Sequence, residues 1–419
     1  MRQNSNYTLI ELNDTYHILP VGQGIADLCN GIQINESCAL LWNLLANDMS
    51  QAELTDAYIS ATGAPDSSEL RSDVKFIIDM FLSRGVMDQT VSSTVLPISN
   101  ADEHQPTTAL LVPAGDTNIP HYKNIRIAAL GIRLYGVSDF FIDNFDIFEV
   151  DDLPAQTMDV TVSTASVSDN IVTNCNKPMI RSVDFNIFDT ASAYIIRYPS
   201  VSAVDTVVFS KDGLLVNIYI KSNLDIDRIR EDLFHAIRLP FLYLAEKHGY
   251  YAVHSASILY RDKAWLFSAS SGTGKSTLAR MWTQAKIADD INGDLNLIGI
   301  SDNVTTVFGI PWCGTSGIYT SVNYPLGGVV FLKRASENTT DPQTLTNGLL
   351  LLSKRIISPI FKPADLHKLF SDLSSLPGSI HFYIHRCTNS VESKDVLKSA
   401  IDLSLLQSSE SPLHDSSHK

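Results

Sequence analysis

The sequence predicts an α/β protein, α+β overall, and three observations predict this class. At residues 264–282 an apolar run, a glycine-rich segment and a helical pattern follow one another, which is the strand–loop–helix order of an α/β phosphate-binding core. Within residues 1–90, short strand patterns precede three helical ones, as in a winged-helix-like module. Between these two regions strand patterns predominate and indicate a β-rich segment.

The chain is long enough for two or three domains, and changes in pattern suggest where they begin and end. Residues 91–107 are polar and turn-rich, which is typical of a linker. The Ser-rich C-terminal end is expected to be disordered. The predicted regions are the module at 1–90, the linker at 91–107, a β-rich segment at 108–245 that packs on the core or belongs to it, the core at 246–405 and the tail at 406–419.

Composition places the chain among ordinary globular proteins and limits its partners. It has 419 residues, of which 44% are hydrophobic and 18% charged. The formal net charge of −15 argues against nucleic-acid and anionic-membrane partners, because both bind basic surfaces. The N-terminus has no signal-peptide pattern, no apolar stretch approaches the ~20 residues that span a bilayer, and the five cysteines include no Cys-x-x-Cys pair. We therefore expect a cytoplasmic protein with reduced thiols.

The N-terminal module is predicted in some detail. Asn35 caps a first helix, and Ser50 with Glu53 forms a capping box at the start of a second. A third helix spans about 67–84 and ends at Gly85, the residue type that favours a helix C-terminus. Three short strands are expected before these helices, at residues 7–11, 16–20 and 31–34.

This module resembles the PqqD-like family, the precursor-recognition domains of peptide-modifying systems. The resemblance covers nearly the whole module and is carried by Ile34-Asn35-Glu36, Leu41-Trp42, Phe81-Leu82 and Gly85-Val86. It implies that a precursor's leader peptide binds as an added strand beside the third strand and against the third helix, where a sheet edge offers main-chain hydrogen bonds. A DNA-binding winged helix is the alternative, which the acidic balance disfavours. The residues expected to bind peptide are Ile32, Gln33, Lys75 and Asp79.

The middle segment contains no cluster of residues that suggests a site. A helix is predicted over 225–245, immediately before the core. The predicted strands of the segment lie at residues 125–130, 133–135, 160–162, 193–198, 206–210 and 214–220.

The glycine-rich segment Gly272-Thr273-Gly274-Lys275-Ser276 predicts a nucleotide site. Its glycines let successive N–H groups turn toward an anion, and the following helix adds its positive N-terminal end. The lysine can then reach the β- and γ-phosphates, and the serine hydroxyl can ligate Mg²⁺. The loop belongs to a variant class, because Ala269 stands where the usual pattern opens with glycine. The residues expected to bind nucleotide are Ser270, Ser271, Gly272, Thr273, Gly274, Lys275, Ser276 and Thr277.

Residues 230–400 resemble the HPr serine kinase/phosphatase family and its shorter relatives. A histidine, His254, precedes the loop at the family's spacing, and Ala288-Asp289-Asp290 follows the loop helix as in that family. The segment Gly309–Gly314 and the apolar run 329–332 also match. The resemblance implies an HPr-kinase-like fold and an ATP- and Mg²⁺-dependent kinase, and it allows a homo-oligomer.

Phosphoryl transfer assigns a role to each of these residues. Lys275 and the loop hold the transferred phosphate, while Ser276 and Asp289 hold Mg²⁺. Asp290, the residue that matches the family's base, orients the acceptor hydroxyl and takes its proton. His254 stabilises charge at the phosphate or orients the base. The predicted catalytic set is thus His254, Lys275 and Asp290, with the last two converging on the terminal phosphate of one ATP.

One departure from the full-length HPr enzyme limits this prediction. Its Glu-rich signature is replaced by GIPWCGTSG at residues 309–317, which contains no carboxylate and argues against phosphatase activity. The cation that contacts the transition state is not assigned, with Arg334 and Arg355 as the candidates.

The two resemblances together predict a tailoring kinase of ribosomally synthesised peptides (a RiPP enzyme), which phosphorylates a Ser or Thr hydroxyl of a precursor held through its leader. Tethering would raise the effective concentration of the acceptor to about millimolar. Two other functions stay open: a kinase for the hydroxyl of a free small metabolite, and a non-catalytic ATP-sensing protein that binds peptide. The phosphate could also serve as an activating intermediate rather than the final product.

Overall fold

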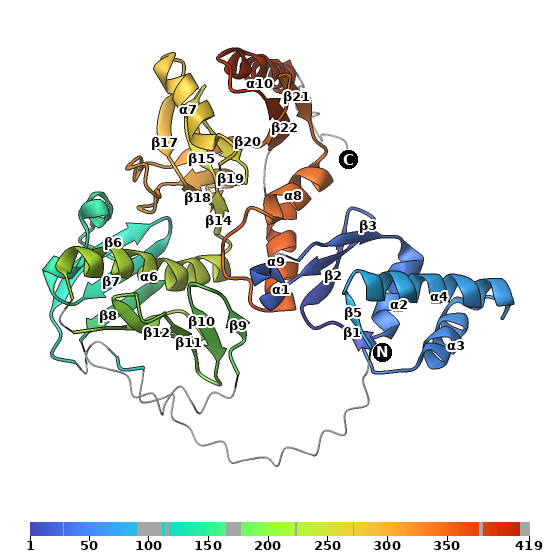
Figure 1. Cartoon of the computed structure of the whole chain (residues 1–419). Coiled ribbons are helices and arrows are strands. Elements are labelled where there is room, and N and C mark those ends of the chain that lie inside the picture. Colours follow the sequence, from blue (N-terminus) through green and yellow to red (C-terminus); the bar gives the residue numbers. More distant parts are fainter. Residues whose placement is uncertain are drawn as a thin grey trace, which may run out of the picture. The chain divides into compact units, whose positions relative to one another are not determined.

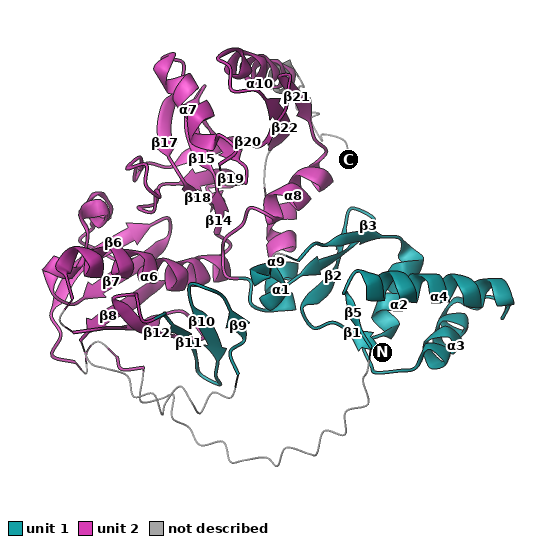
Figure 2. Ribbon diagram, viewed as in Figure 1, with its two compact units in different colours: residues 1–109, 168–199, 360–368 teal, residues 110–167, 200–359, 369–419 magenta. Residues whose placement is uncertain are grey.

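The computed structural model describes residues 1–27, 29–89, 111–113, 115, 117–164, 177–222, 224–270, 272–376 and 380–410, without the side chains of 408–410. The predicted linker at 91–107, Ser271 and residues 411–419 lie outside the described residues. The chain forms two compact units, coloured separately in Figure 2. Unit 1 comprises 1–109, 168–199 and 360–368, and unit 2 comprises 110–167, 200–359 and 369–419.

The boundaries of these units fall at other residues than those of the predicted domains. Residues 168–199 and 360–368 belong with the N-terminal module, although both are distant from it in sequence. Most of the β-rich segment shares unit 2 with the core, which is one of the two arrangements expected for it, and helix α6 (Ile226–Lys247) runs across the boundary predicted at residue 245. The C-terminal helix α10 (Glu392–Glu410) likewise continues past the predicted end of the core at residue 405.

Unit 1 contains the predicted strands and helices of the N-terminal module (Figure 1). A three-stranded antiparallel sheet has the order β2-β3-β4, so β4 is an edge strand. The short strands β1 (Arg2–Gln3) and β5 (Met87–Asp88) pair separately. The other elements are β2 (Tyr7–Leu12), β3 (Thr15–Pro20), β4 (Ile32–Ile34), α1 (Gln23–Ala26), α2 (Glu36–Leu44), α3 (Gln51–Thr62), α4 (Ser68–Ser83) and an antiparallel set β9 (Ile180–Arg181), β10 (Asn186–Asp189) and β11 (Ala193–Arg197).

The predicted helix ends of unit 1 are confirmed. The Asn35 side chain accepts a hydrogen bond from the Cys38 N–H, and the Ser50–Glu53 capping box is complete. Gly85 has φ of 69°, the left-handed conformation that ends a helix. Inside the module, Trp42 and Phe81 are buried with their ring centroids 5.9 Å apart in an edge-to-face contact, which fixes α2 against α4.

The first sheet of unit 2 includes strands in the order β6-β7-β8-β13-β12, and α6 packs on it. The sheet is mixed, since β7 pairs with β8 and β8 with β13 in parallel. A 3₁₀ segment (Asp143–Phe148) follows β7 and carries the buried Phe145. The strands span β6 (His121–Ile127), β7 (Leu130–Tyr135), β8 (Thr157–Ser163), β12 (Val204–Ser210) and β13 (Leu215–Ile220).

The second sheet of unit 2 holds the predicted core, and its order is β14-β18-β19-β20-β16-β15-β17, with β22 beside β20 and β21 beside β22. Its strands are β14 (Tyr251–His254), β15 (Ala256–Tyr260), β16 (Lys263–Ser268), β17 (Asp289–Asn292), β18 (Leu295–Ser301), β19 (Val304–Phe308), β20 (Tyr324–Arg334), β21 (Thr339–Pro342) and β22 (His381–Cys387). Its helices are α7 (Lys275–Gln284), α8 (Leu345–Ser353) and α10, while α9 (Pro363–Ser374) has its first residues in unit 1 and its last in unit 2.

Strand direction in this sheet determines where a site can form. Strands β16, β20 and β22 are parallel neighbours. Because β15 is antiparallel to both β16 and β17, β17 points the same way as β16. The carboxyl ends of all four strands therefore meet at one edge of the sheet, which is where α/β proteins bind ligands. Trp265 and Phe267 of β16 are buried against Leu278 and Trp282 of α7, so the helix after the loop is firmly packed.

The fold is mixed α/β, as predicted. Over the part of the chain that the structure describes, no helix is both long and apolar enough to cross a bilayer.

Candidate active site

The phosphate-binding loop joins β16 to α7 at the carboxyl edge of the second sheet of unit 2. Gly272 (φ 72°) and Gly274 (φ 116°) have positive φ, as predicted for a loop whose N–H groups turn toward an anion. Ala269 does not have positive φ, which explains why alanine is tolerated at the first position of the pattern. Helix α7 has no side-chain N-cap, so its first N–H groups face the loop. The Lys275 Nζ folds back and donates to the Ala269 carbonyl at 3.3 Å.

A histidine–carboxylate pair lies beside the start of this loop. The Nε2 of His254, the last residue of β14, is 3.2 Å from the Oδ1 of Asp294. The Ser268 hydroxyl donates to the His254 carbonyl at 2.7 Å, which ties the histidine to the strand that leads into the loop. The main-chain N–H of Ser255 donates to the Asp294 carbonyl at 2.9 Å. Both members of the pair are thus fixed through their own backbone, and both side chains are about one-third exposed (34% and 38%).

Asn292 positions Asp294 from the end of β17. Its side-chain oxygen accepts the N–H groups of Asp294 and Leu295 at 3.0 and 3.1 Å. Its amide nitrogen donates to the carbonyls of Ile310 and Trp312 at 3.2 and 3.3 Å. The buried amide therefore joins the turn that carries Asp294 to the loop at residues 309–317, which was predicted as part of the core but without a role.

Electrostatics connect Lys275 to this pair. The hydrogen bond from His254 is the largest influence on Asp294 and holds the pKa of its carboxyl below the usual range, with help from Lys275 and Arg238. Burial lowers the pKa of the Lys275 ammonium, which the charge of Asp294 partly restores and that of Arg355 lowers further. His254, Lys275 and Asp294 thus influence one another electrostatically, with Arg238 and Arg355 as further cations that act on them.

In the structure the predicted base Asp290 lies away from Lys275. Asp289 and Asp290 begin β17 and pair with Leu259 and Ile258, which in turn pair with Ala264 and Trp265 of β16, several residues before the loop. Asp290 bonds to the side chain of Thr283, near the far end of α7 and about 12 Å along the helix from Lys275. Burial, together with the charge of Asp289, raises the pKa of the Asp290 carboxyl. Asp290, the predicted base, and Asp289, the predicted Mg²⁺ ligand, thus lie nearer the far end of α7 than the loop.

The carboxylate at the loop is Asp294, which sequence reasoning missed. The motif Asp-Asp after the loop helix drew the assignment to the first residues of β17, whereas the strand's direction brings its last residues to the loop. The available signal was Asn292-Gly293-Asp294, a turn with a carboxylate directly after the predicted strand.

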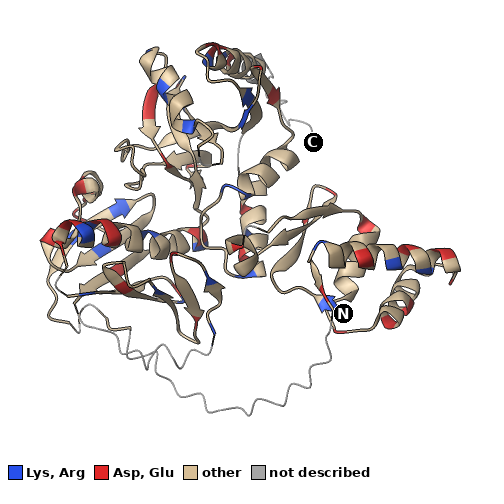
Figure 3. Ribbon diagram, in the orientation of Figure 1, with Lys and Arg blue, Asp and Glu red and all other residues tan. Residues whose placement is uncertain are grey.

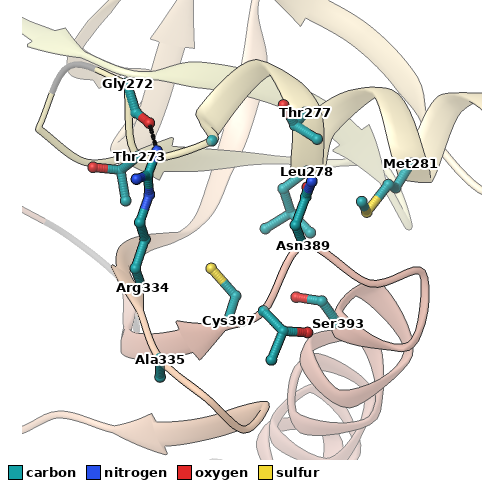
Figure 4. Close-up of a pocket in the computed structure, with 12 residues that line it drawn as sticks. Gly272, Thr273, Thr277, Leu278, Met281, Arg334, Ala335, Cys387, Asn389 and Ser393 are labelled. Carbon is teal, nitrogen blue, oxygen red and sulfur yellow. Dashed lines mark hydrogen bonds between the residues drawn. The ribbon is translucent and has the colours of Figure 1, made fainter.

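A cavity of about 420 Å³ lies on the other side of the loop (Figure 4). One wall is the exposed face of α7, and the other comes from the ends of β20 and β22 and the start of α10. Arg334, the last residue of β20, donates a hydrogen bond to the Gly272 carbonyl across the mouth of the cavity (Figure 4). The lining residues are Gly272, Thr273, Gly274, Thr277, Leu278, Met281, Arg334, Ala335, Cys387, Thr388, Asn389 and Ser393.

The remaining predicted site residues also have definite places. Ser270 and Ser276 are exposed, and Thr273, Gly274 and Thr277 line the cavity. Within the described residues, no group of three or more His, Cys, Asp or Glu side chains could hold a metal ion.

Comparisons with known proteins find remote likeness among solved structures only. No family model and no curated protein matches the chain. Among solved structures, the chain is similar to the HPr(Ser) kinase/phosphatase from Coxiella burnetii, with 7% identity and a TM-score of 0.25 over 38% of this chain and 98% of that one. Conclusions about function therefore depend on the geometry of the site alone.

Proposed function

We propose that the chain is an ATP-dependent phosphotransferase that moves the γ-phosphoryl group to an alcohol. The observation that carries this proposal is the cluster of Lys275 with the bonded pair His254–Asp294 at the open side of a phosphate-binding loop. The loop and Lys275 hold a triphosphate end, and the carboxylate stands where an acceptor hydroxyl would approach it. A loop that only bound nucleotide would have no need of an oriented carboxylate beside its lysine.

Asp294 supplies the acceptor side of the reaction. Its free carboxylate oxygen accepts the hydrogen bond of the acceptor hydroxyl and receives the proton as the new P–O bond forms. The bond between the γ-phosphorus and the β–γ bridging oxygen breaks, and ADP leaves with that electron pair. The transition state is loose, so the hydroxyl becomes acidic only late, and a carboxylate with a lowered pKa is basic enough. His254 keeps that carboxylate in one orientation.

The same residues fit Mg²⁺, which kinases use with ATP. The exposed Ser276 hydroxyl makes no hydrogen bond to any described residue, so its oxygen is free to ligate the ion. Hydroxyl and carboxylate oxygens are the donors that Mg²⁺ prefers. When bound, the ion would neutralise charge on the β- and γ-phosphates.

The cavity beside α7 is the place for the nucleoside. It opens from the glycines of the loop, and its lining combines apolar Leu278 and Met281 with hydroxyl and amide groups, which suits a base and a ribose. A nucleotide that enters from this side extends its phosphates along the loop toward Lys275 and Asp294. The triphosphate therefore ends at the catalytic cluster.

We propose further that the acceptor is a Ser or Thr hydroxyl of a ribosomally made precursor peptide held by unit 1. Support comes from β4, an edge strand with the exposed Gln33 at its centre. On α4, Lys75 and Asp79 are exposed and flank Phe76, an aromatic ring that is 72% exposed and needs a partner. Acidic side chains predominate on the helices of this module (Figure 3), which favours a peptide with basic residues and disfavours DNA.

Mass spectrometry tests both levels of the proposal. The full-length protein is incubated with MgATP and each precursor peptide encoded beside its gene, and we expect a gain of about 80 Da on a Ser or Thr. ATP binding without this gain on any such peptide would overturn the peptide assignment. ADP release with a free metabolite in the same assay would favour the small-molecule kinase instead.

Two matched aspartate variants test the catalytic cluster. Asp294→Asn is expected to lower kcat by about 10²–10⁴-fold while ATP still binds, because the amide keeps the shape and loses the base. Asp290→Asn, nearer the far end of α7 than the loop, is expected to keep kcat within about twofold. The reverse ranking of the two variants would reject Asp294 as the base.

A further inference from the structure

We propose that Arg355 is a catalytic residue whose guanidinium contacts the phosphoryl group in flight, whereas Arg334 holds the loop on the nucleoside side. The inference rests on the proposed phosphotransferase function and assigns separate roles to the two arginines. Arg334 contacts the loop from the end of β20, whereas Arg355 comes from the segment after α8 and acts on Lys275 through its charge.

The main chain places Arg355 beside the catalytic pair. The Arg355 carbonyl accepts the N–H of His254 at 2.8 Å, and the next residue, Ile356, forms a β-bridge with Val253. Arg355 follows Lys354, the C-cap of α8, and its own N–H donates to the Leu352 carbonyl at 2.8 Å. Leu352 is buried, so this turn is anchored in the core. The backbone of Arg355 is therefore held in a fixed position next to His254.

The guanidinium of Arg355 has unused hydrogen-bond donors that an anion could accept. It is half-buried and has no hydrogen bond or ion pair to any described residue, although a guanidinium carries five N–H donors. Its charge acts on Lys275 and lowers the pKa of that ammonium. Two neighbouring, partly buried cations repel one another, and a phosphate between them relieves the repulsion and satisfies the donors. The group that meets this requirement is the γ-phosphoryl group held by Lys275.

Arg334 has a different place and a different partner. Its guanidinium donates to the Gly272 carbonyl and lines the nucleoside cavity (Figure 4). It therefore fixes the loop that holds the β-phosphate, and it stays bonded to the protein throughout the reaction. During transfer, the bond to ADP breaks and the bond to the acceptor oxygen forms. The negative charge of the moving phosphoryl group is then spread over its three equatorial oxygens. Arg355 neutralises these oxygens, and the acceptor's proton goes to Asp294.

Binding of a transition-state mimic tests this assignment without a known acceptor. The probes are MgADP alone and MgADP with aluminium fluoride, which imitates the planar phosphoryl group, and calorimetry measures their affinities for the full-length protein. We expect aluminium fluoride to tighten MgADP binding to the wild type. In Arg355→Gln the tightening should be lost while the affinity for MgADP alone stays within about twofold, and Arg355→Lys should recover part of it because the charge is kept. In Arg334→Gln the affinity for MgADP itself should fall.

The neighbouring exposed Lys354 gives the control, since Lys354→Gln removes a positive charge without removing a group near the loop. We expect this variant to behave as the wild type. With an acceptor in hand, Arg355→Gln should lower kcat by about 10²–10³-fold. Equal tightening in the wild type and Arg355→Gln would overturn the inference alone. No tightening in the wild type would overturn the phosphotransferase proposal, and the inference with it.

Discussion

At the scale of single residues, the site depends on where one carboxylate lies. Asp289 and Asp290 have the sequence signature, but they are at the start of β17, whereas Asp294 lies in the turn that follows the strand. The loop, Lys275 and His254 could be predicted because each depends on local sequence or on a motif. The partner of His254 could not, because it depends on the direction in which β17 joins the sheet.

The hydrogen bond between His254 and Asp294 should set the acid limb of the pH–rate profile. Asp294 must be ionised to act, and the bond from His254 is the main reason that its pKa is below the usual value. An ordinary aspartate has a pKa of about 4. The acid limb of kcat/KM in the wild type should therefore lie at a lower pH than that value. Replacing the histidine in His254→Leu removes the donor, and the limb should move to higher pH.

Steady-state rates between pH 3.5 and 8 check this shift. Asp290→Asn is the control, since that carboxylate is remote from the loop and its loss should leave the limb unchanged. An acid limb that stays in place in His254→Leu would mean that Asp294 does not govern it.

At the scale of elements, the loop at residues 309–317 packs against Asp294 and helps to hold it in position. Trp312 is buried, and its indole N–H donates to the Phe234 carbonyl of α6 at 2.9 Å. Gly314 lies against Asp294, so that a Cβ at this glycine would be 2.9 Å from the Cβ of the aspartate. The sequence predicted that this segment belongs to the core. Its contact with Asp294 could not be predicted, because it depends on a packing distance.

A pair of glycine variants separates this contact from backbone strain. Gly314 and Gly317 both have positive φ (60° and 67°), so alanine at either costs about 1–2 kcal/mol of stability. Only the Cβ at Gly314 meets Asp294, whereas a Cβ at Gly317 meets no atom within 4 Å. Gly314→Ala should therefore lower kcat at least tenfold with ATP affinity unchanged. Gly317→Ala should share the loss of stability and keep kcat. Equal rates in the two variants would show that this loop does not position Asp294.

At the scale of the whole molecule, one buried histidine should shape the stability of the chain in acid. His385 on β22 is buried, with its two ring nitrogens hydrogen-bonded to the hydroxyls of Thr340 and Ser393 at 2.8 and 2.9 Å. Burial lowers its pKa from 6.5 to about 4. The unfolded chain takes up this proton as the pH falls through 6.5, and the folded chain does so only near 4. The stability that neutral His385 contributes is thus present above pH 6.5 and is lost between pH 6.5 and 4, by up to about 3 kcal/mol.

Urea unfolding of the full-length protein at a series of pH values measures this slope. His385→Gln should flatten the fall in unfolding free energy between pH 6.5 and 4, whatever its effect at neutral pH. His121→Gln, at an exposed residue that begins β6, controls for the loss of one histidine. An unchanged slope in His385→Gln would contradict the prediction.

The presence of two units in one chain predicts how a peptide substrate should behave. If unit 1 holds the leader, a precursor with its leader should have a KM at least tenfold below that of the core peptide alone, because binding raises the local concentration of the acceptor. The leader added as a separate peptide should not restore this advantage.

The variant Phe76→Asp tests the proposed peptide surface, where the Phe76 ring is 72% exposed. It should raise the KM of the leader-bearing peptide and leave the KM values of the core peptide and of ATP unchanged. Val183→Asp, at an apolar residue of unit 1 that is 95% exposed, is the matched control and should change neither KM. Equal KM values for the two peptides in the wild type would leave unit 1 without a part in substrate binding.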